Sequence, residues 1–279
     1  MRNNYHNDAT SEKYLKLLKK YRIIPKKELG QNFLVSNRIL RRIIQFSRLK
    51  KGEEVLEIGP GLGFLTKELL EKKVKVVAVE IDRNLARILE RRLGKNKNLK
   101  IIQENILKIK DYKQKIIGSI PYQITSPLIR KILTSKSKPK TAILLVQKEV
   151  AERIIAKPGS SNRGYLSVIT QIFGEPEILF YVGRENFFPE PKVDSALLKL
   201  NIKEKEPKFD KEKLLRLVKF GFSQKRKKLR NSLSAGLHQK PKEIDKILNS
   251  LKIDTNLRAE DLSIKDWEKI LFVVDKELI

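Results

Sequence analysis

Short apolar runs alternate with amphipathic stretches along the first two hundred residues of the chain. Each run is only a few residues long, ends in polar or turn-forming residues and is rich in Val, Ile and Leu. Parallel strands that are covered on both faces have this composition, because neither face meets water. Strands are therefore expected at 55–58, 74–79, 99–103, 115–120, 141–146 and 178–182, with a last strand that ends at residue 202.

Helical spacing of apolar residues fills the intervals between these strands. Ser36 is a good N-cap for a helix that should run through Phe46, and Asp82 should cap a second helix that runs through Leu93. This alternation of strands and helices implies right-handed crossovers and a parallel sheet, closed by an antiparallel hairpin. Further helices should begin near residues 125, 147 and 164.

The pattern changes after residue 203. Residues 203–210 lack apolar periodicity and indicate a linker. Beyond it the periodicity is helical, with no strand candidate of comparable strength, so a small all-α domain is expected at 205–279 after an α/β domain at 29–204. Residues 1–28 form a basic leader in which 12–21 could be an amphipathic helix or a solvated tail. The expected C-terminal helices are 211–222, 227–235, 242–251 and 263–276.

A glycine-rich turn follows the strand at 55–58 directly. Gly59, Gly61 and Gly63 allow the backbone to turn sharply and to approach a ligand closely. The next strand ends in Glu80, which is where such a unit offers a carboxylate to ribose hydroxyls. Phe64 stands where a dinucleotide fingerprint needs its third glycine, so a pyrophosphate-binding dehydrogenase is disfavoured. The pattern predicts a site for a nucleoside cofactor.

The residues that are rare in this chain exclude several chemistries. The 279 residues include no cysteine and two histidines, which excludes disulfides, thiolate zinc sites and cysteine nucleophiles and makes a histidine triad improbable. We expect no metal. No apolar window is long enough to span a membrane and the N-terminus is polar, so cytoplasmic residence without membrane association is the expectation.

The formal net charge of +28 points to a polyanionic partner, and nucleic acid is the first candidate. A lysine-rich genome composition is the alternative explanation. Residues 1–51 contain 14 Lys and Arg against 3 Asp and Glu, so this part could lie along a phosphate backbone. A second cluster either contacts RNA, which we favour, or is a solvated face. It consists of Lys225, Arg226, Lys227, Lys228 and Arg230.

Several motifs resemble those of a known family. The pattern Glu57-x-Gly59-x-Gly61-x-Gly63 resembles the cofactor loop of class I S-adenosylmethionine (SAM) methyltransferases. Other segments resemble, in the same order along the chain, motifs of the KsgA/RsmA family of rRNA adenine N6,N6-dimethyltransferases. They are Gly-Gln-Asn-Phe-Leu at 30–34, Ser-Ile-Pro-Tyr at 119–122, and the segments 187–196, 226–233 and 258–263.

The resemblance implies a Rossmann-like sheet with a small helical domain, SAM as the cofactor and a monomeric enzyme. It also implies the substrate, two adjacent adenosines near the 3′ end of small-subunit rRNA, methylated as the immature small ribosomal subunit is assembled. Ser119 and the carbonyl of Ile120 would accept from the target amine, Pro121 would hold the turn, and Tyr122 and Phe187 would stack on the base. The implied cofactor contacts are Asn32, Leu34, Glu57, Gly59, Gly61, Glu80, Asn105 and Ser119.

Two positions depart from the family pattern. Asn105 stands where the family usually has Asp, and Ser119 where it usually has Asn. Asn105 keeps an amide oxygen that accepts from the adenine amine of SAM, whereas the Ser119 hydroxyl is shorter and donates as well as accepts. Two alternatives stay open at this point. They are an RNA-binding assembly factor with weak or no catalysis, and an Erm-type methyltransferase of large-subunit rRNA.

Overall fold

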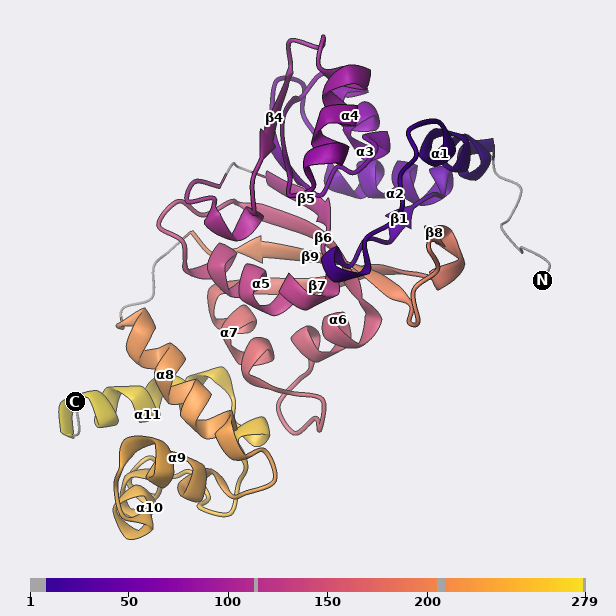
Figure 1. The fold of residues 1–279 in the computed structure, drawn as a ribbon. Coiled ribbons are helices and arrows are strands. Elements are labelled where there is room, and N and C mark those ends of the chain that lie inside the picture. Colours follow the sequence, from indigo (N-terminus) through magenta and orange to yellow (C-terminus); the bar gives the residue numbers. More distant parts are fainter. Residues whose placement is uncertain (1–8, 113–114, 205–208, 278–279) are drawn as a thin grey trace. The chain divides into compact units, whose positions relative to one another are not determined.

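The computed structural model describes residues 9–112, 115–204 and 209–277 (Figure 1). The chain divides into two compact units that interleave along the sequence. The first contains the residues up to 151 together with 177–202, and the second contains 152–176 and the residues from 203 onward. The predicted linker at 203–210 lies partly outside the described residues. The functional boundaries expected at residues 28 and 204 stay a prediction.

A seven-stranded sheet in the order β4-β3-β2-β5-β6-β9-β7 confirms the predicted α/β class. The pairs from β4 to β6 are parallel, and β9 is antiparallel to β6. The strands lie within a few residues of their predicted positions, although β7 begins earlier than expected. They are β2 (Glu54–Ile58), β3 (Lys75–Glu80), β4 (Leu99–Gln103), β5 (Lys115–Ser119), β6 (Thr141–Gln147), β7 (Gly174–Val182) and β9 (Ser195–Ile202).

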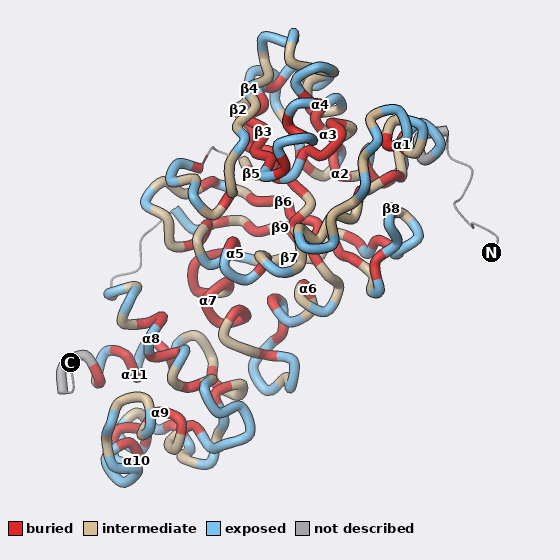
Figure 2. The backbone as a smooth tube through the Cα atoms, viewed as in Figure 1, coloured by how far each residue is buried: buried red, intermediate tan, exposed pale blue. Residues whose placement is uncertain are grey.

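The interior of this sheet is the core of the first unit. Figure 2 shows burial concentrated along the central strands, where Val55, Ile117 and Leu145 are almost fully covered. Strands that are buried on both faces cannot alternate polar and apolar residues, which is why their sequences are continuous apolar runs.

Helices connect the strands of the first unit. Asp82 caps α4 as predicted, since its carboxylate accepts from the N–H groups of Asn84 and Leu85. Ser36 occupies the N-cap position of α2, but its side chain makes no capping hydrogen bond. That helix is held instead by its buried apolar face. The helices are α1 (Ala9–Lys20), α2 (Asn37–Ser47), α3 (Phe64–Glu71), α4 (Arg83–Leu93), α5 (Thr125–Thr134) and α6 (Lys148–Ile155), with short 3₁₀ turns η1 (Lys27–Leu29), η2 (Ile106–Lys108), η3 (Tyr122–Ile124) and η4 (Arg184–Asn186).

A two-stranded ribbon joins two segments that are far apart in the sequence. β1 (Phe33–Leu34) pairs with β8 (Phe187–Phe188) in antiparallel register, so that Phe33 faces Phe188 and Leu34 faces Phe187. A backbone hydrogen bond of 2.8 Å from Val35 N–H to the Asn186 carbonyl extends the pairing. The segment 30–34 and the segment that begins at Phe187 are therefore fastened together.

The described residues of the second unit are mostly helical, and those from 209 onward form helices close to the positions predicted for them. Trp267 is fully buried in its core and stacks against Phe222 at 6.0 Å between ring centroids. A Cβ at Gly221 would lie 2.3 Å from the Trp267 ring, so only glycine fits there. The elements are α7 (Tyr165–Phe173), α8 (Lys211–Gly221), η5 (Phe222–Gln224), α9 (Leu229–Leu237), α10 (Pro241–Ser250), η6 (Ala259–Asp261) and α11 (Ile264–Glu277).

Candidate functional site

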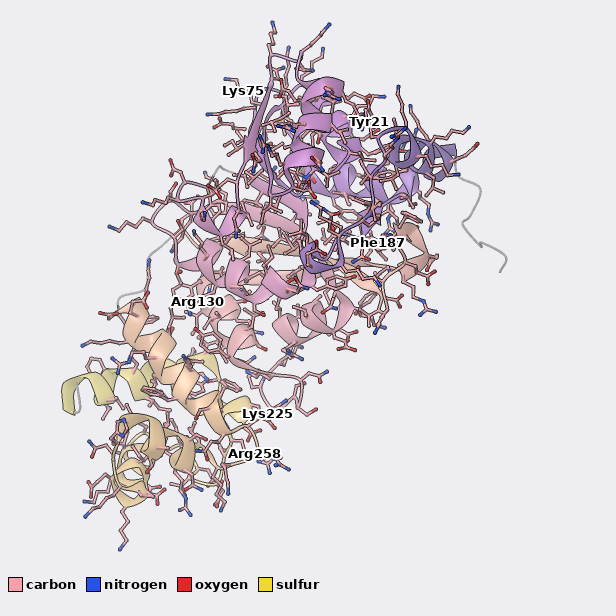
Figure 3. The ribbon with its side chains drawn as sticks, viewed as in Figure 1. Tyr21, Lys75, Arg130, Phe187, Lys225 and Arg258 are labelled. Carbon is pink, nitrogen blue, oxygen red and sulfur yellow. The ribbon has the colours of Figure 1, made fainter. Side chains whose placement is uncertain are left out.

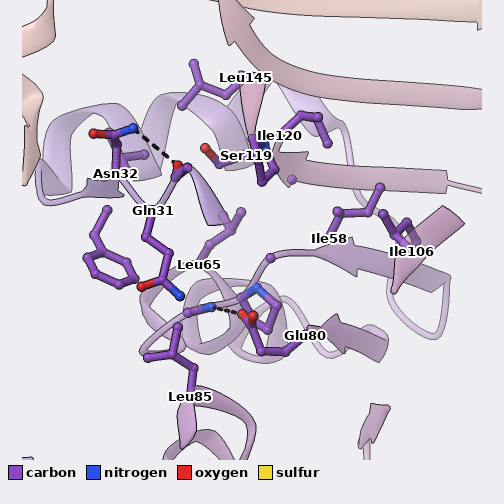
Figure 4. A pocket seen from close by; sticks show the side chains of 18 of the residues that line it. Gln31, Asn32, Ile58, Leu65, Glu80, Leu85, Ile106, Ser119, Ile120 and Leu145 are labelled. Carbon is purple, nitrogen blue, oxygen red and sulfur yellow. Dashed lines mark hydrogen bonds between the residues drawn. The ribbon is translucent and has the colours of Figure 1, made fainter. Parts of the chain in front are cut away.

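A cavity opens at the carboxyl ends of the parallel strands in the first unit, the edge at which open α/β sheets bind ligands (Figure 4). Its lining comes from the glycine loop, from the ends of β3 and β5, and from the segment 29–34. Nearly all of the residues assigned to a cofactor or target-base site from the sequence line it. They are Asn32, Leu34, Gly59, Gly61, Glu80, Asn105, Ser119, Ile120, Pro121, Tyr122 and Phe187.

The glycine loop between β2 and α3 needs its glycines. Gly59, Gly61 and Gly63 have φ values of +65°, +55° and +78°, at which any residue with a side chain would be strained. A Cβ at Gly63 would also meet Leu89 at 2.4 Å, and a Cβ at Gly59 would lie 3.2 Å from the carbonyl oxygen of Ser119. The loop can therefore approach both the end of β5 and a ligand.

Glu80 ends β3 with its carboxylate at the cavity. One oxygen accepts from the Gly61 N–H at 3.1 Å and the other from the Asp82 N–H at 3.0 Å. The side chain is 5% exposed, and burial raises the pKa of the carboxyl against the lowering effect of the two N–H donors. Two fixed donors thus aim a carboxylate whose remaining lone pairs are available to a ligand.

Glu57, near the end of β2, is buried close to the glycine loop. It is 1% exposed and is not among the residues that line the cavity. Neither carboxyl oxygen has a hydrogen-bond partner of normal geometry among the described residues, and burial raises the pKa to about 8 despite the nearby Thr66 hydroxyl. The group is therefore neutral at pH 7, and the predicted direct contact of Glu57 with the cofactor stays a prediction.

The segment 30–34 also lines the cavity. Asn32 donates to the Gly30 carbonyl at 3.2 Å, which fixes the turn. The side chain of Gln31 accepts from the Lys26 N–H at 2.8 Å and donates to Asp82 at 3.1 Å. Figure 4 shows Gln31 and Asn32 at the cavity with Glu80. Gln31 was missed as a site residue, although its place in the recognised pentapeptide was the available signal.

The tetrapeptide after β5 lies at the same cavity. The Ile120 N–H donates to the Leu145 carbonyl at 3.0 Å, and the Pro121 carbonyl accepts from the Ile124 N–H at 3.1 Å. These bonds fix the backbone that follows Ser119, whose hydroxyl lies at the cavity (Figure 4). The tetrapeptide therefore lies at the cavity, and the roles of Ser119 and the Ile120 carbonyl as acceptors stay a prediction.

Two aromatic rings border this end of the cavity. The Tyr122 hydroxyl lies 3.4 Å from Ser195 Oγ, and burial raises the pKa of Tyr122, so the phenol stays neutral. Ser195 is 1% exposed, lines the cavity and was not predicted as a site residue. Phe187 also lines the cavity, but only 2% of its surface is exposed.

Asn105 lies at the cavity just beyond β4. Its side-chain oxygen accepts from the Leu107 N–H at 2.9 Å and so caps the turn η2. An amide oxygen has two lone pairs, which leaves one for a ligand. The predicted contact with an adenine amine stays a prediction.

The predicted RNA-binding cations lie in the second unit, away from these cavity residues in sequence. Lys225, Arg226, Lys227 and Lys228 are exposed. Figure 3 places Lys225 and Arg258 in this helical unit. Lys225 reaches the Ser161 carbonyl at 2.7 Å and Lys228 reaches Asn256 at 2.6 Å. Arg230 instead forms an ion pair of 3.1 Å with Asp245 and is partly buried, so it is the least available of the five cations.

Neither a candidate metal-binding cluster nor a candidate membrane-spanning helix is present among the described residues. In this part of the chain no group of three or more His, Cys, Asp or Glu side chains is arranged to hold a metal ion. Within the same ranges, no helix combines the length and the apolar composition that crossing a bilayer would require.

Comparisons with known proteins agree with this geometry. Residues 24–276 match the family model described as ribosomal RNA adenine dimethylase. The ribosomal RNA small subunit methyltransferase A of Alkaliphilus metalliredigens is 39% identical over 266 residues, which cover 90% of this chain and 92% of that protein. The protein of the same name from Desulfitobacterium hafniense is 40% identical over 259 residues, 90% of this chain and 93% of that protein.

Solved structures give the same picture. A dimethyladenosine transferase from Plasmodium falciparum superposes with a TM-score of 0.78 at 30% identity and covers 86% of this chain and 96% of its own. The 23S rRNA methyltransferase ErmE gives a TM-score of 0.65 at 27% identity, covering 87% of this chain and 99% of its own. With a family model that matches nearly the whole chain and relatives near 40% identity, the chain belongs to the ribosomal RNA adenine dimethylase family of methyltransferases.

Proposed function

We propose that the protein binds SAM and dimethylates the N6 amines of two adjacent adenosines near the 3′ end of small-subunit rRNA, as a step in small-subunit biogenesis. The relatives' names support the substrate. The observation that carries the proposal is that one cavity unites the glycine loop, Glu80 and the tetrapeptide that begins at Ser119.

The residues at the cavity fit SAM. Gly59 and Gly61 leave room for a ligand at the loop, and the aimed carboxylate of Glu80 suits the two hydroxyls of a ribose. Ile81, which is 46% exposed and lines the cavity, offers an apolar surface to adenine, and the free lone pair of Asn105 suits its amine. When bound, SAM supplies an electrophilic methyl group on a sulfonium.

The target amine needs help from the protein because its lone pair is delocalised into the adenine ring. Ser119 Oγ and the Ile120 carbonyl would accept from the amine hydrogens and so orient the nitrogen toward the methyl group. The hydrogen bonds of Ile120 and Pro121 hold these acceptors in place before the substrate arrives. Such preorganised acceptors act most strongly in the transition state.

Stacking would hold the base after it leaves its RNA stack. Tyr122 lies at the cavity as a neutral ring, and stacking on an aromatic ring is worth about 1–3 kcal/mol per base. This offsets much of the unstacking cost of a few kcal/mol. Phe187 is covered, so its contact with the base requires a local movement of β8.

The exposed cations Lys225 to Lys228 would contact the rRNA backbone. Charge of this density at the surface attracts phosphate whatever the sequence, and the side chains of Arg226 and Lys227 make no hydrogen bond or ion pair within the described residues. The tetrapeptide at 119–122 would then act in methyl transfer to the base, whereas the cluster at 225–228 would supply affinity for the RNA backbone.

Transfer of a labelled methyl group tests the proposal. Small and large ribosomal subunits from a strain that lacks this protein are incubated separately with the protein and labelled SAM. We expect label only in the small-subunit rRNA, as N6,N6-dimethyladenosine in nucleoside digests. Label in the large subunit would identify an Erm-type enzyme, and binding without label would identify an assembly factor.

A further inference from the structure

The N-terminal helix α1 packs on the cofactor loop instead of extending as a free basic arm. Its inward residues Tyr14 and Leu18 are 3% and 4% exposed, and they belong to one apolar cluster with Phe33 and Leu62. Leu62 lies in the middle of the glycine loop. The outer residues of α1, such as Lys16, remain exposed.

Tyr14 lies where the loop and the segment 30–34 approach each other. Its ring stacks on Phe64, the first residue of α3, with 4.3 Å between centroids and an interplanar angle of 20°. Its centroid is 5.7 Å from that of Phe33. A Cβ at Gly61 would come within 3.6 Å of the Tyr14 hydroxyl oxygen. Tyr14 lines the same cavity as Glu80.

Three peptide N–H groups of the glycine loop have hydrogen-bond partners in the structure. Those of Gly59, Gly61 and Gly63 donate to the Val79 carbonyl, to Glu80 and to the Pro60 carbonyl. Residue 60 is a proline and has no N–H. The N–H of Leu62, a residue with no exposed surface, lies close enough to the Tyr14 hydroxyl to lower the pKa of the phenol. The Tyr14 hydroxyl is thus the group placed to accept from the remaining N–H donor of this buried loop.

Burial also keeps Tyr14 in one chemical form. Desolvation raises its pKa, and the charge of Glu80 adds to the effect, so the phenol retains its proton. A neutral hydroxyl can accept from a peptide N–H and still donate its own proton.

We propose that Tyr14 is a positioning residue of the cofactor site: it fixes the glycine loop through the Leu62 N–H and forms the cavity wall beside Gly61. The proposal rests on the proposed function, because it names a further residue of the same SAM site. It assigns the helix α1 to cofactor binding, whereas the charge of this part of the chain had suggested RNA.

Calorimetric titration of the full-length protein with SAM tests the role of Tyr14. The variant Tyr14→Phe keeps the ring but removes the hydroxyl oxygen as an acceptor. The glycine loop should then sample more conformations, which SAM binding has to restrict again. We expect affinity to fall roughly tenfold, which corresponds to about 1.4 kcal/mol. Its RNA affinity, measured at fixed salt, should not change.

Two control variants separate positioning from general stability. Leu18→Ala removes a buried side chain from the same helix without touching the cavity, and Tyr21→Phe removes a hydroxyl from a tyrosine that does not line it. We expect Leu18→Ala to lower the thermal midpoint more than Tyr14→Phe does while weakening SAM less. Tyr21→Phe should leave SAM affinity unchanged.

The outcomes distinguish this inference from the proposed function. Wild-type SAM affinity in a folded Tyr14→Phe variant would overturn the inference, while the Glu80→Ala variant would still lose affinity and support the cofactor assignment. A wild-type protein that does not bind SAM would overturn both. If Tyr14→Phe fails to fold, amide exchange in the wild type decides, because a Leu62 N–H that exchanges as fast as a free amide contradicts the hydrogen bond.

Discussion

Glu57 and Glu80 are carboxyl groups on neighbouring strands with different surroundings. Glu80 has two peptide N–H donors and faces the cavity, whereas Glu57 is buried and neither of its carboxyl oxygens has a hydrogen-bond partner among the described residues. The sequence assigned both carboxyls to the cofactor site. What separates them is the number of donors each oxygen meets, which depends on how the loop at Gly61 folds back and cannot be read from residue types.

Glu57 should make the stability of the protein depend on pH. Its pKa is about 8 in the folded protein against an ordinary value of 4.5, so the folded state binds more protons than the unfolded chain between these values. The contribution of neutral Glu57 to the free energy of unfolding is fully present at low pH. It is lost as the pH rises, by up to about 1.4 kcal/mol per pH unit. The isosteric Glu57→Gln variant stays neutral, so its advantage over the wild type should grow from pH 5 to pH 8 in denaturant titrations. A constant difference would contradict the role of Glu57.

Ser119 should matter for the reaction rate more than for cofactor binding. Its hydroxyl is proposed to accept from the target amine, and loss of such an acceptor typically costs on the order of 10²-fold in rate. We expect Ser119→Ala to slow methyl transfer by about this factor in single-turnover assays, while SAM affinity changes little. Ser119→Asn, which restores the usual family residue, should keep activity. Wild-type rates in Ser119→Ala would show that the Ile120 carbonyl and the stacking rings suffice.

At the scale of elements, strands and helices followed from periodicity because burial dictates their composition. The runs near Val55 and Ile143 are apolar since they are covered on both faces. Much of the cavity could also be predicted, because the carboxyl ends of parallel strands meet at one edge. The ribbon of β1 and β8, the partners of Gln31 and the docking of Tyr14 could not, since they depend on tertiary contacts between segments without periodicity.

Asp82 joins three elements and should be costly to replace. It caps α4, bonds to Gln31 and pairs with Lys26 at 2.9 Å. Burial alone would raise its pKa, but Lys26 and the N–H donors hold the pKa below its usual range, so this stability is present at neutral pH and is lost as pH falls. We expect Asp82→Ala to cost about 1–2 kcal/mol at pH 7 in denaturant titrations. Lys26→Ala removes only a half-exposed partner and should cost about 1 kcal/mol or less. Equal losses would show that the cap contributes nothing.

At the scale of the whole molecule, the basic cluster predicted to bind RNA and the candidate cofactor cavity belong to different units. The cavity belongs to the first unit, and the exposed cations at 225–228 belong to the second. The net charge of +28 could predict a polyanionic partner from composition alone. It could not show that Arg230 is already paired with Asp245, because that partner lies on another helix.

The basic cluster should determine how RNA binding depends on salt. Replacement of Lys225, Arg226, Lys227 and Lys228 by Ala should flatten the slope of log affinity against log salt concentration, by roughly 0.7–0.9 for each phosphate that the variant no longer neutralises. Arg230→Ala should change this slope little, because that side chain is held by Asp245. Filter-binding or anisotropy titrations with small-subunit rRNA measure both. An unchanged slope in the quadruple variant would make the cluster a solvated face.

The ribbon of β1 and β8 bears on processivity. Leu34 belongs to the segment that covers the cofactor cavity, and its partner Phe187 belongs to the segment proposed to hold the target base. The cofactor that has lost its methyl group has to leave before a second SAM molecule binds. Because β1 and β8 are paired, a movement of one strand displaces the other. A base should therefore be released after each transfer, so that free monomethylated rRNA accumulates early in a time course with excess substrate. The two methyl groups on one adenosine would then come from separate encounters, and the final product would depend on how long enzyme and immature subunit remain together.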